Sequence, residues 1–349
     1  MGAPLAAIFG CAGPELTADE RAFYRASSPL GFILFARNVQ EPDQVRALVS
    51  EMRGCVGRDD APVLIDQEGG RVQRLGPPHW RAAPTAGSIA DLHSVDANAG
   101  EEAASLNAAL IAAELADLGI TVDCVPVLDV PQPGSHDVIG DRAVGRTPGQ
   151  SARLGNIVCG QMIAHGVVPV IKHIPGHGRA TVDSHHDLPI VDAPLEELRS
   201  VDFAPFRDTA ELAWGRPWGM TAHVVYTAID PNAPATTSAT VIADIIRDEI
   251  GFEGFLVSDD LSMKALGGSL GDRTTASLAA GCDAVLHCNG EMEEMIAVAS
   301  AAGALGDTAF ARYTATENSR KIFGSSGSSS LDRETTDARI RRLLGKLAA

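Results

Sequence analysis

The chain has 349 residues, of which 45% are hydrophobic and 21% charged, and its formal net charge is −17. This composition is typical of a soluble protein with a hydrophobic core, and the length allows one large barrel domain. A strongly acidic chain repels nucleic-acid phosphates and anionic membranes, so we expect neither nucleic acid nor membrane as a partner.

At the N-terminus, the segment MGAPLAAIFGCAG has no Lys or Arg before an apolar run that is short and broken by Gly10. It is therefore not expected to be a signal peptide, and no later stretch is long enough to span a bilayer. The six cysteines are scattered without a CxxC pair, which is typical of reduced core residues. We expect a cytoplasmic protein. The acidic composition and the lack of a partner motif favour a monomer.

Along the chain, short apolar runs alternate with longer helical patterns. The apolar runs are Leu5–Phe9, Gly31–Phe35, Pro62–Asp66, Thr121–Leu128, Val168–His173, Gly219–Val224, Phe255–Ser258 and Cys282–His287. Such continuous runs are typical of parallel strands that are covered on both faces. Between them lie the helical patterns Pro42–Arg53, Glu101–Leu118, Gln150–His165, Pro194–Leu212 and Thr240–Ile250, and Thr17 with Glu20 forms a capping-box signature. Eight strands alternating with helices predict an α/β fold, a single-domain (β/α)8 TIM-type barrel.

Beyond Asn289 the pattern changes to helices without strands. These helices are expected at Glu291–Leu305, Thr308–Ile322 and Asp332–Leu344, with the polar segment Gly324–Ser330 before the last. We therefore assign residues 1–323 to the barrel domain, 324–331 to a linker and 332–349 to a C-terminal helix. That helix is expected to pack on the barrel, because it has too few residues to form a core of its own.

Polar residues gather where the apolar runs end. The third run ends in Asp66 and continues to Arg74, the fifth ends in Lys172 and His173, and the seventh is followed by Asp259. In a TIM barrel the C-terminal ends of the strands form the active-site face, so these side chains are expected to share one pocket. Taken singly, Asp66 could cap a loop and Lys172 could form a structural salt bridge.

Four histidines, His173, His177, His185 and His186, stand within the short segment KHIPGHGRATVDSHHDLP. A zinc-binding HxxxH pair needs a helix, and Pro175–Gly176 breaks one between His173 and His177. No nearby Cys or Glu completes a tetrahedral set, so we expect no metal site. His185 and His186 remain equivalent on spacing alone, and either could merely cap a turn.

Five segments in order carry a family resemblance. They are IDQEGGRVQRL (Ile65–Leu75), IGDR (Ile139–Arg142), KHIPGHG…DSHHDLP (Lys172–Pro189), MTAHVVY (Met220–Tyr226) and GFEGFLVSDDLSM (Gly251–Met263). Over residues 5–290 the chain resembles the family 3 glycoside hydrolases, in particular the bacterial β-N-acetylglucosaminidases of peptidoglycan recycling. The resemblance implies a retaining exo-hydrolase that cleaves terminal β-linked N-acetylglucosamine from peptidoglycan (muropeptide) fragments through a covalent glycosyl-enzyme. It implies no metal and no cofactor.

By position, the resemblance makes Asp259 the nucleophile and the pair Asp183 and His185 the general acid/base. The positions that would bind the N-acetylglucosamine unit are Asp66, Arg74, Arg142, Lys172 and His173. A histidine titrates near neutrality and can exchange a proton at cytoplasmic pH, while an aspartate two residues earlier can fix its tautomer. The chain departs from the family pattern at Ile174, at Arg179–Ala180 and in the segment AVGRTPGQ after Arg142, which makes Arg142 the least secure assignment.

Two other functions fit parts of this pattern. One is a β-N-acetylglucosaminide phosphorylase, because a neutral histidine repels incoming phosphate less than a carboxylate would. The other is a catalytically idle sugar-binding or scaffold protein, although the full nucleophile and acid/base set favours an enzyme.

Overall fold

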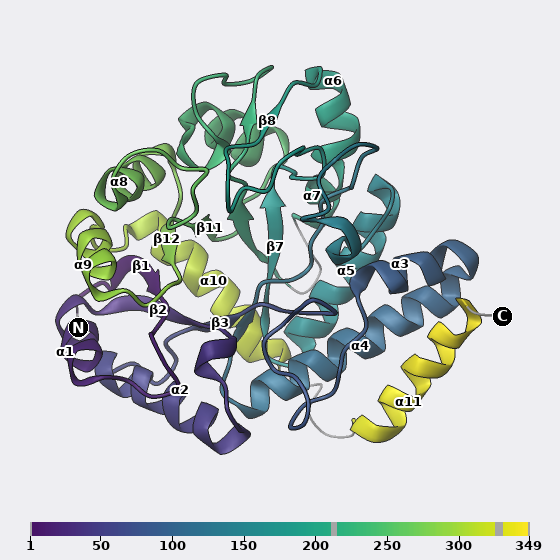
Figure 1. Cartoon of the computed structure of the whole chain (residues 1–349), viewed down its shortest axis with the longest axis horizontal. Coiled ribbons are helices and arrows are strands. Elements are labelled where there is room, and N and C mark those ends of the chain that lie inside the picture. The colour runs from purple at the N-terminus through teal and green to yellow at the C-terminus, as the bar shows by residue number, and fades with distance from the viewer. Residues whose placement is uncertain (1, 211–214, 325–330, 348–349) are drawn as a thin grey trace.

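Eight parallel strands form a closed barrel at the centre of the molecule (Figure 1). The computed structural model describes residues 2–210, 215–324 and 331–347. In barrel order the strands are β1 (Leu5–Phe9), β12 (Ala284–His287), β11 (Leu256–Asp260), β9 (Trp218–Thr221), β7 (Val168–Ile174), β6 (Val122–Asp123), β3 (Val63–Ile65) and β2 (Pro29–Leu34). Each strand overlaps one of the eight apolar runs and extends at most two residues beyond it, so the predicted barrel is confirmed.

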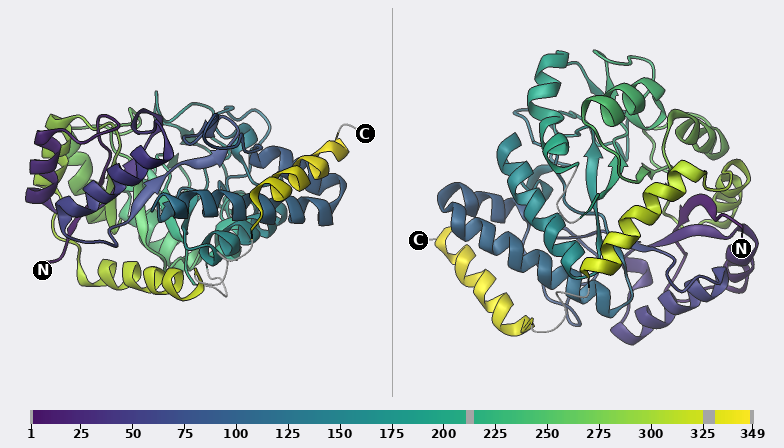
Figure 2. Two further views of the ribbon diagram at one scale, coloured as in Figure 1. Left: turned by 90° about the horizontal axis from the view of Figure 1, so that it is seen from below. Right: turned by 180° about the vertical axis from the view of Figure 1, so that it is seen from behind.

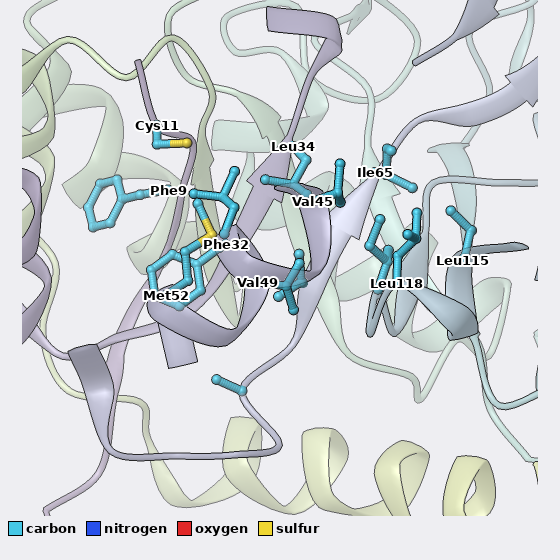
Figure 3. Close-up of a cluster of buried hydrophobic side chains, with 14 of the residues drawn as sticks. Phe9, Cys11, Phe32, Leu34, Val45, Val49, Met52, Ile65, Leu115 and Leu118 are labelled. Atoms are coloured by element: carbon cyan, nitrogen blue, oxygen red, sulfur yellow. The ribbon is translucent and has the colours of Figure 1, made fainter. Parts of the chain in front are cut away.

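Alternate residues of the strands fill two separate layers. Ile8 of β1 and Val257 of β11 belong to the cluster inside the barrel, whereas their neighbours Phe9 and Leu256 belong to the clusters between the barrel and its helices. Figure 3 shows part of that outer layer, where strand residues such as Ile65 meet side chains of the surrounding helices. Because the side-chain period of a strand is two, both faces must be apolar, which explains the continuous runs.

The helices surround the barrel (Figure 1). They are α1 (Ala18–Ser27), α2 (Pro42–Val56), α3 (Ala86–Val95), α4 (Ala97–Asp117), α5 (Pro148–Ala164), α6 (Leu195–Glu197), α7 (Ala204–Thr209), α8 (Leu270–Ala280), α9 (Met292–Ala301), α10 (Asp307–Phe323) and α11 (Arg333–Leu344), with π-helical turns at η3 (Leu198–Asp202) and η5 (Val241–Glu249). The capping box of α1 is confirmed, since Glu20 N–H donates to Thr17 Oγ1 at 3.1 Å. The sequence patterns did not predict α3 or α8.

The predicted helix Pro194–Leu212 is not continuous. Its described part consists of α6, η3 and α7 in succession, and residues 211 and 212 lie outside the described residues. Pro205 stands at the start of α7, where its missing N–H costs no helical hydrogen bond. The π-helical turn η3 places Asp202 in the interior.

The last two helices occupy different sides of the barrel. α10 lies across the N-terminal ends of the strands, opposite the long loops (Figure 2, left), and its Arg312 pairs with Asp283 at 2.7 Å just before β12. α11 runs beside α4, with Ile340 and Leu343 buried. Residues 325–330, most of the expected linker, lie outside the described residues, so the division into barrel, linker and helix stays a prediction.

Two small sheets stand in the loops at the C-terminal end of the barrel. β4 (Gln67–Gly69) and β5 (Val72–Gln73) form a hairpin directly after β3, while β8 (Ile190–Val191) pairs with β10 (Val225–Tyr226) beyond β7 and β9. The hairpin turn uses Gly69 and Gly70, which both have positive φ. These sheets order loops at the C-terminal ends of the barrel strands. Within the described ranges, no helix has the length and apolarity that crossing a bilayer requires.

Candidate active site

A pocket of about 450 Å³ opens at the C-terminal ends of the barrel strands. Its lining comes from β2, β7, β9, β11 and β12 and from the segments that follow β2, β3, β6, β7, β11 and β12. Seven of the eight site residues predicted from the sequence line it: Asp66, Arg74, Arg142, Lys172, His173, His185 and Asp259. The eighth, Asp183, contacts His185. The expected convergence of strand-end residues is therefore present.

Ion pairs join the cations and carboxylates on one side of the pocket. Lys172 Nζ lies 2.8 Å from Asp66 Oδ1 and 2.7 Å from Glu68 Oε1. Arg74 Nη2 donates to Asp66 Oδ2 at 3.0 Å, and Arg142 holds Glu68 through two hydrogen bonds of 2.8 and 2.9 Å. With Lys172 only 2% exposed, each buried charge needs such a partner. The structure thus supplies the anionic partners that a buried lysine requires.

These ion pairs keep the carboxylates charged. Burial acts to raise the pKa of Asp66, but Lys172 and Arg74 outweigh it and hold that pKa below its usual range. Glu68 behaves in the same way, with Lys172 and Arg142 lowering its pKa against the effect of burial. The sequence motifs alone do not identify Glu68, although a buried lysine needs an acidic partner and Glu68 stands in the IDQEGG segment.

The buried Asp129 orients His173. Its Oδ2 lies 2.7 Å from His173 Nδ1, and the carboxylate also accepts the backbone N–H of His173 and of His177. Burial acts to raise the pKa of Asp129, but the neighbouring imidazoles of His173 and His177 outweigh it, so the pKa is lowered. The contact fixes His173 Nδ1, so Nε2 is the nitrogen that can meet a ligand. Asp129 was missed from the sequence, although it directly follows the fourth apolar run.

Asp259 lies near the end of β11 and faces the pocket. Burial acts to raise the pKa of Asp259, but His223, His173 and the backbone N–H of Asp260, at 2.8 Å, together lower it. The neighbouring Asp260 carboxylate accepts instead from Ser262, whose hydroxyl lies 2.5 Å away, and from backbone N–H groups. Asp259 is therefore held as an ionised carboxylate that faces the pocket, the form in which a carboxylate can act as a nucleophile.

Asp183 and His185 lie in the loop between β7 and β8. Asp183 Oδ1 is 2.7 Å from His185 Nδ1, and the His185 side chain is 60% exposed. Burial acts to raise the pKa of Asp183, but the two hydrogen bonds from His185 lower it. His186 is exposed and does not line the pocket, which separates the two histidines that spacing left equivalent. His177 is buried, and burial lowers its pKa to about 4, so it is neutral at pH 7.

Residues 19–314 match the glycosyl hydrolase family 3 N terminal domain. The chain belongs to glycosyl hydrolase family 3. It is 40% identical over 284 residues to a β-hexosaminidase of Methylococcus capsulatus, covering 81% of this chain and 82% of that protein. Native NagZ from Neisseria gonorrhoeae superposes with a TM-score of 0.85 at 31% identity over 98% of both chains, and its complex with N-trifluoroacetyl-D-glucosamine with 0.85 at 30% identity over 98% of both.

The family expected from the sequence is thus confirmed, and this family 3 protein is a glycoside hydrolase. Its pocket combines a charged carboxylate on a rigid strand with a His–Asp pair on a loop, a set suited to displacement at a sugar carbon with proton transfer. Among the described residues, no group of three or more His, Cys, Asp or Glu side chains is arranged to hold a metal ion.

Proposed function

We propose that this hydrolase is a retaining exo-β-N-acetylglucosaminidase that removes terminal β-linked N-acetylglucosamine from peptidoglycan fragments. The observation that carries the proposal is the presence of Asp259 and the Asp183–His185 pair at one pocket. The relative named β-hexosaminidase and the N-acetylglucosamine analogue in the gonococcal complex support the choice of sugar. The peptidoglycan substrate and the role in cell-wall recycling are inferred from the family resemblance of the sequence motifs.

In the first step, Asp259 attacks the anomeric carbon and forms a glycosyl ester. At the same time His185, protonated on Nε2, gives that proton to the glycosidic oxygen, so the leaving sugar departs as a neutral alcohol. The lowered pKa of Asp259 keeps the nucleophile ionised at neutral pH. Asp183 holds the Nδ1 proton of His185 and stabilises the imidazolium before it acts.

In the second step, a water molecule attacks the anomeric carbon from the side that the leaving group vacated. His185 Nε2, now neutral, accepts a proton from this water, and the ester bond to Asp259 breaks. The sugar leaves with its β configuration, and the imidazolium of His185 and the carboxylate of Asp259 are restored. The exposure of His185 gives it access to both the leaving group and the water.

The N-acetylglucosamine unit is assigned to the side of the pocket formed by Asp66, Arg74, Arg142, Lys172 and His173. Charged donors and acceptors that are already held by ion pairs are preorganised for sugar hydroxyls and need little rearrangement on binding. Arg142 also positions Glu68 through two hydrogen bonds, and Glu68 in turn pairs with Lys172.

We further propose a cytoplasmic, monomeric enzyme. All six cysteines are buried free thiols, which is typical of a reducing compartment. The net charge of −17 opposes self-association at low ionic strength.

The test uses p-nitrophenyl N-acetyl-β-D-glucosaminide and the native β-linked disaccharide. Asp259→Ala is expected to abolish turnover of both, and a slowly released fluorinated N-acetylglucosaminyl donor should label the peptide that contains Asp259. Nuclear magnetic resonance of the first-formed sugar should show the β anomer. Full activity in Asp259→Ala, or an α anomer, contradicts the proposal.

Adding phosphate to the same assay distinguishes the phosphorylase. Release of the free sugar in the presence of phosphate supports hydrolysis, whereas a sugar 1-phosphate would assign the pocket to phosphorolysis. Tight sugar binding without turnover of any aryl glycoside would identify an idle binding protein.

A further inference from the structure

The loop of residues 175–189, which carries the proposed acid/base, is fixed by backbone hydrogen bonds near both ends, since His136 N–H donates to Ala180 O at 2.8 Å and Val225 N–H to Pro189 O at 3.0 Å. Tyr226 Oη donates to Gly176 O at 2.5 Å, and Gln132 N–H donates to Gly178 O at 3.0 Å. The tip has weaker ties: His177 Nε2 lies 3.2 Å from Ser184 Oγ, and Ala265 N–H lies 3.3 Å from Ser184 O. The position of the tip therefore also depends on the side chains at the boundary between the anchored first part of the loop and the tip.

Arg179 stands at this boundary, four residues before Asp183. Its Nε donates to Asp202 Oδ2 at 2.7 Å, and its Nη1 lies 3.1 Å from Glu197 Oε2. Asp202 belongs to η3 and Glu197 to α6, so this one side chain ties the loop to the helices outside the barrel. The side chains of Arg179 and Asp202 are only 17% and 1% exposed.

A buried ion pair of this kind adds little stability, because removing both charges from water costs about as much as their attraction returns. Asp202 Oδ1 also has no hydrogen-bond partner among the described residues, so its carboxylate is only half satisfied. Packing adds a constraint, because a Cβ on Gly176 would lie 2.9 Å from Asp202 Cβ. The pair is thus costly and closely fitted to the loop, which is typical of a positioning role.

We propose that the Arg179–Asp202 ion pair sets the position of the loop tip and thereby places His185 for proton transfer to the leaving group. Arg179 and Asp202 are positioning residues, since neither lines the pocket. The inference rests on the proposed acid/base role of His185. A displacement of about 1 Å in a catalytic group can cost two orders of magnitude in rate, so a single anchor can matter.

The pH dependence of the pair follows from its surroundings. Asp202 faces Arg179 from the loop, Glu197 from α6, Asp129 from the segment after β6 and Tyr226 from β10. Burial raises the pKa of Asp202 to about 6; Arg179 opposes this effect, and Asp129 and Glu197 add to it. Acidification from pH 7 to 5 therefore neutralises Asp202 and weakens its hold on Arg179.

The experiment compares two substrates, because acid assistance matters for a poor leaving group and hardly for an activated one. In Arg179→Ala and Asp202→Asn, kcat/KM for the β-linked disaccharide is expected to fall about tenfold or more, and for the 2,4-dinitrophenyl glycoside by less than about twofold. Arg179→Lys should recover part of the loss. In the native enzyme, activity on the disaccharide should fall between pH 7 and 5 as Asp202 is neutralised. Asp202→Asn should not show this additional fall.

Arg199→Ala is the matched control. Arg199 also lies on η3 and pairs with Glu249 at 2.9 Å, so its removal should change neither substrate by more than about twofold. Equal losses on both substrates in Arg179→Ala and Asp202→Asn, or no loss in either, overturn the inference. If Arg179→Ala does not fold, Asp202→Asn alone decides.

His185→Ala separates this inference from the proposed function. If His185→Ala loses both substrates equally, the acid/base assignment fails. If it spares the activated glycoside and Arg179→Ala does not, only the role of the ion pair fails.

Discussion

Asp183 Oδ1 accepts two hydrogen bonds from His185, one from the ring at 2.7 Å and one from the backbone N–H at 2.9 Å. Two bonds to one oxygen fix both the tautomer and the orientation of the ring, which leaves Nε2 to exchange protons. In the proposed reaction Asp183 acts through His185 and does not touch the substrate. Removing the Asp183 carboxylate should therefore weaken general acid catalysis by His185.

Asp183→Asn and His185→Ala should each depend on the leaving group. We expect kcat/KM for the disaccharide to fall about 10²-fold or more in both variants, because general acid catalysis contributes on that scale. The 2,4-dinitrophenyl glycoside should be affected far less in the first step. Asp187→Asn is the control, since this exposed carboxylate lies in the same loop. Equal losses on both substrates would refute the assignment.

Much of the pocket could be predicted because it stands on regular strands. Parallel strands bring their C-terminal ends together, so Asp66, Lys172, His173 and Asp259 could be placed in one site without any tertiary contact. A register irregularity in β7 between Lys172 and Ile174 lets two successive side chains line the pocket. The strand pattern alone, with its period of two, does not predict that arrangement.

The partners of these residues could not be predicted. Asp129 reaches His173 from the segment after β6, and Arg179 meets Asp202 across 23 positions of the chain. Such pairs depend on loop and π-helical geometry that no local pattern in the sequence determines. The unusual Arg179 was visible as a departure from the family, but its role required the position of Asp202.

Lys172→Met should destabilise the fold strongly. The change removes the cation that Asp66 and Glu68 share, and leaving a buried charge unpaired costs about 3–5 kcal/mol. Urea unfolding at pH 7 measures the difference. Lys321→Ala is the control, because its pair with Asp60 is about half exposed and should cost less than about 1 kcal/mol. Similar values for the two variants would mean that Lys172 is not needed for the fold.

The contribution of the Glu68 carboxylate to the stability of the fold should vanish in acid. Its pKa is lowered in the folded state, so its stabilisation is complete above the unfolded pKa of about 4.3 and is lost as pH falls through the folded value. We expect Glu68→Gln to be clearly less stable than the native chain at pH 7 and the gap to narrow below about pH 4. Unfolding curves at pH 7, 5 and 3.5 test this. If the difference in stability between Glu68→Gln and the native chain grows in acid, the pKa of Glu68 is raised in the folded state and not lowered.

The contribution of Asp202 to the stability of the fold should depend on pH in the opposite direction. Its pKa is raised to about 6, so the folded state binds this proton more tightly than the unfolded chain, and stability through this group falls as pH rises through 6. Asp202→Asn lacks this titration. The free energy of unfolding of the variant should therefore rise relative to that of the native chain as the pH is raised from 5 to 8. Thermal unfolding at both pH values measures the gain. A variant that is less stable at pH 8 than at pH 5, relative to the native chain, would mean that Arg179 stabilises the pair more than burial opposes it.

Leu343→Ala should show whether α11 is part of the folded unit. Leu343 is buried in the cluster that includes Leu92 and Ala103 of α3 and α4, so truncation should cost about 2–5 kcal/mol if helix and barrel unfold together. Arg342→Ala, one residue earlier on an exposed position, should change stability by less than about 0.5 kcal/mol. The two variants are compared by urea unfolding with the signal of the barrel. Because that signal comes from the barrel, a Leu343→Ala curve that matches the native one would show that α11 can detach without loss of the fold.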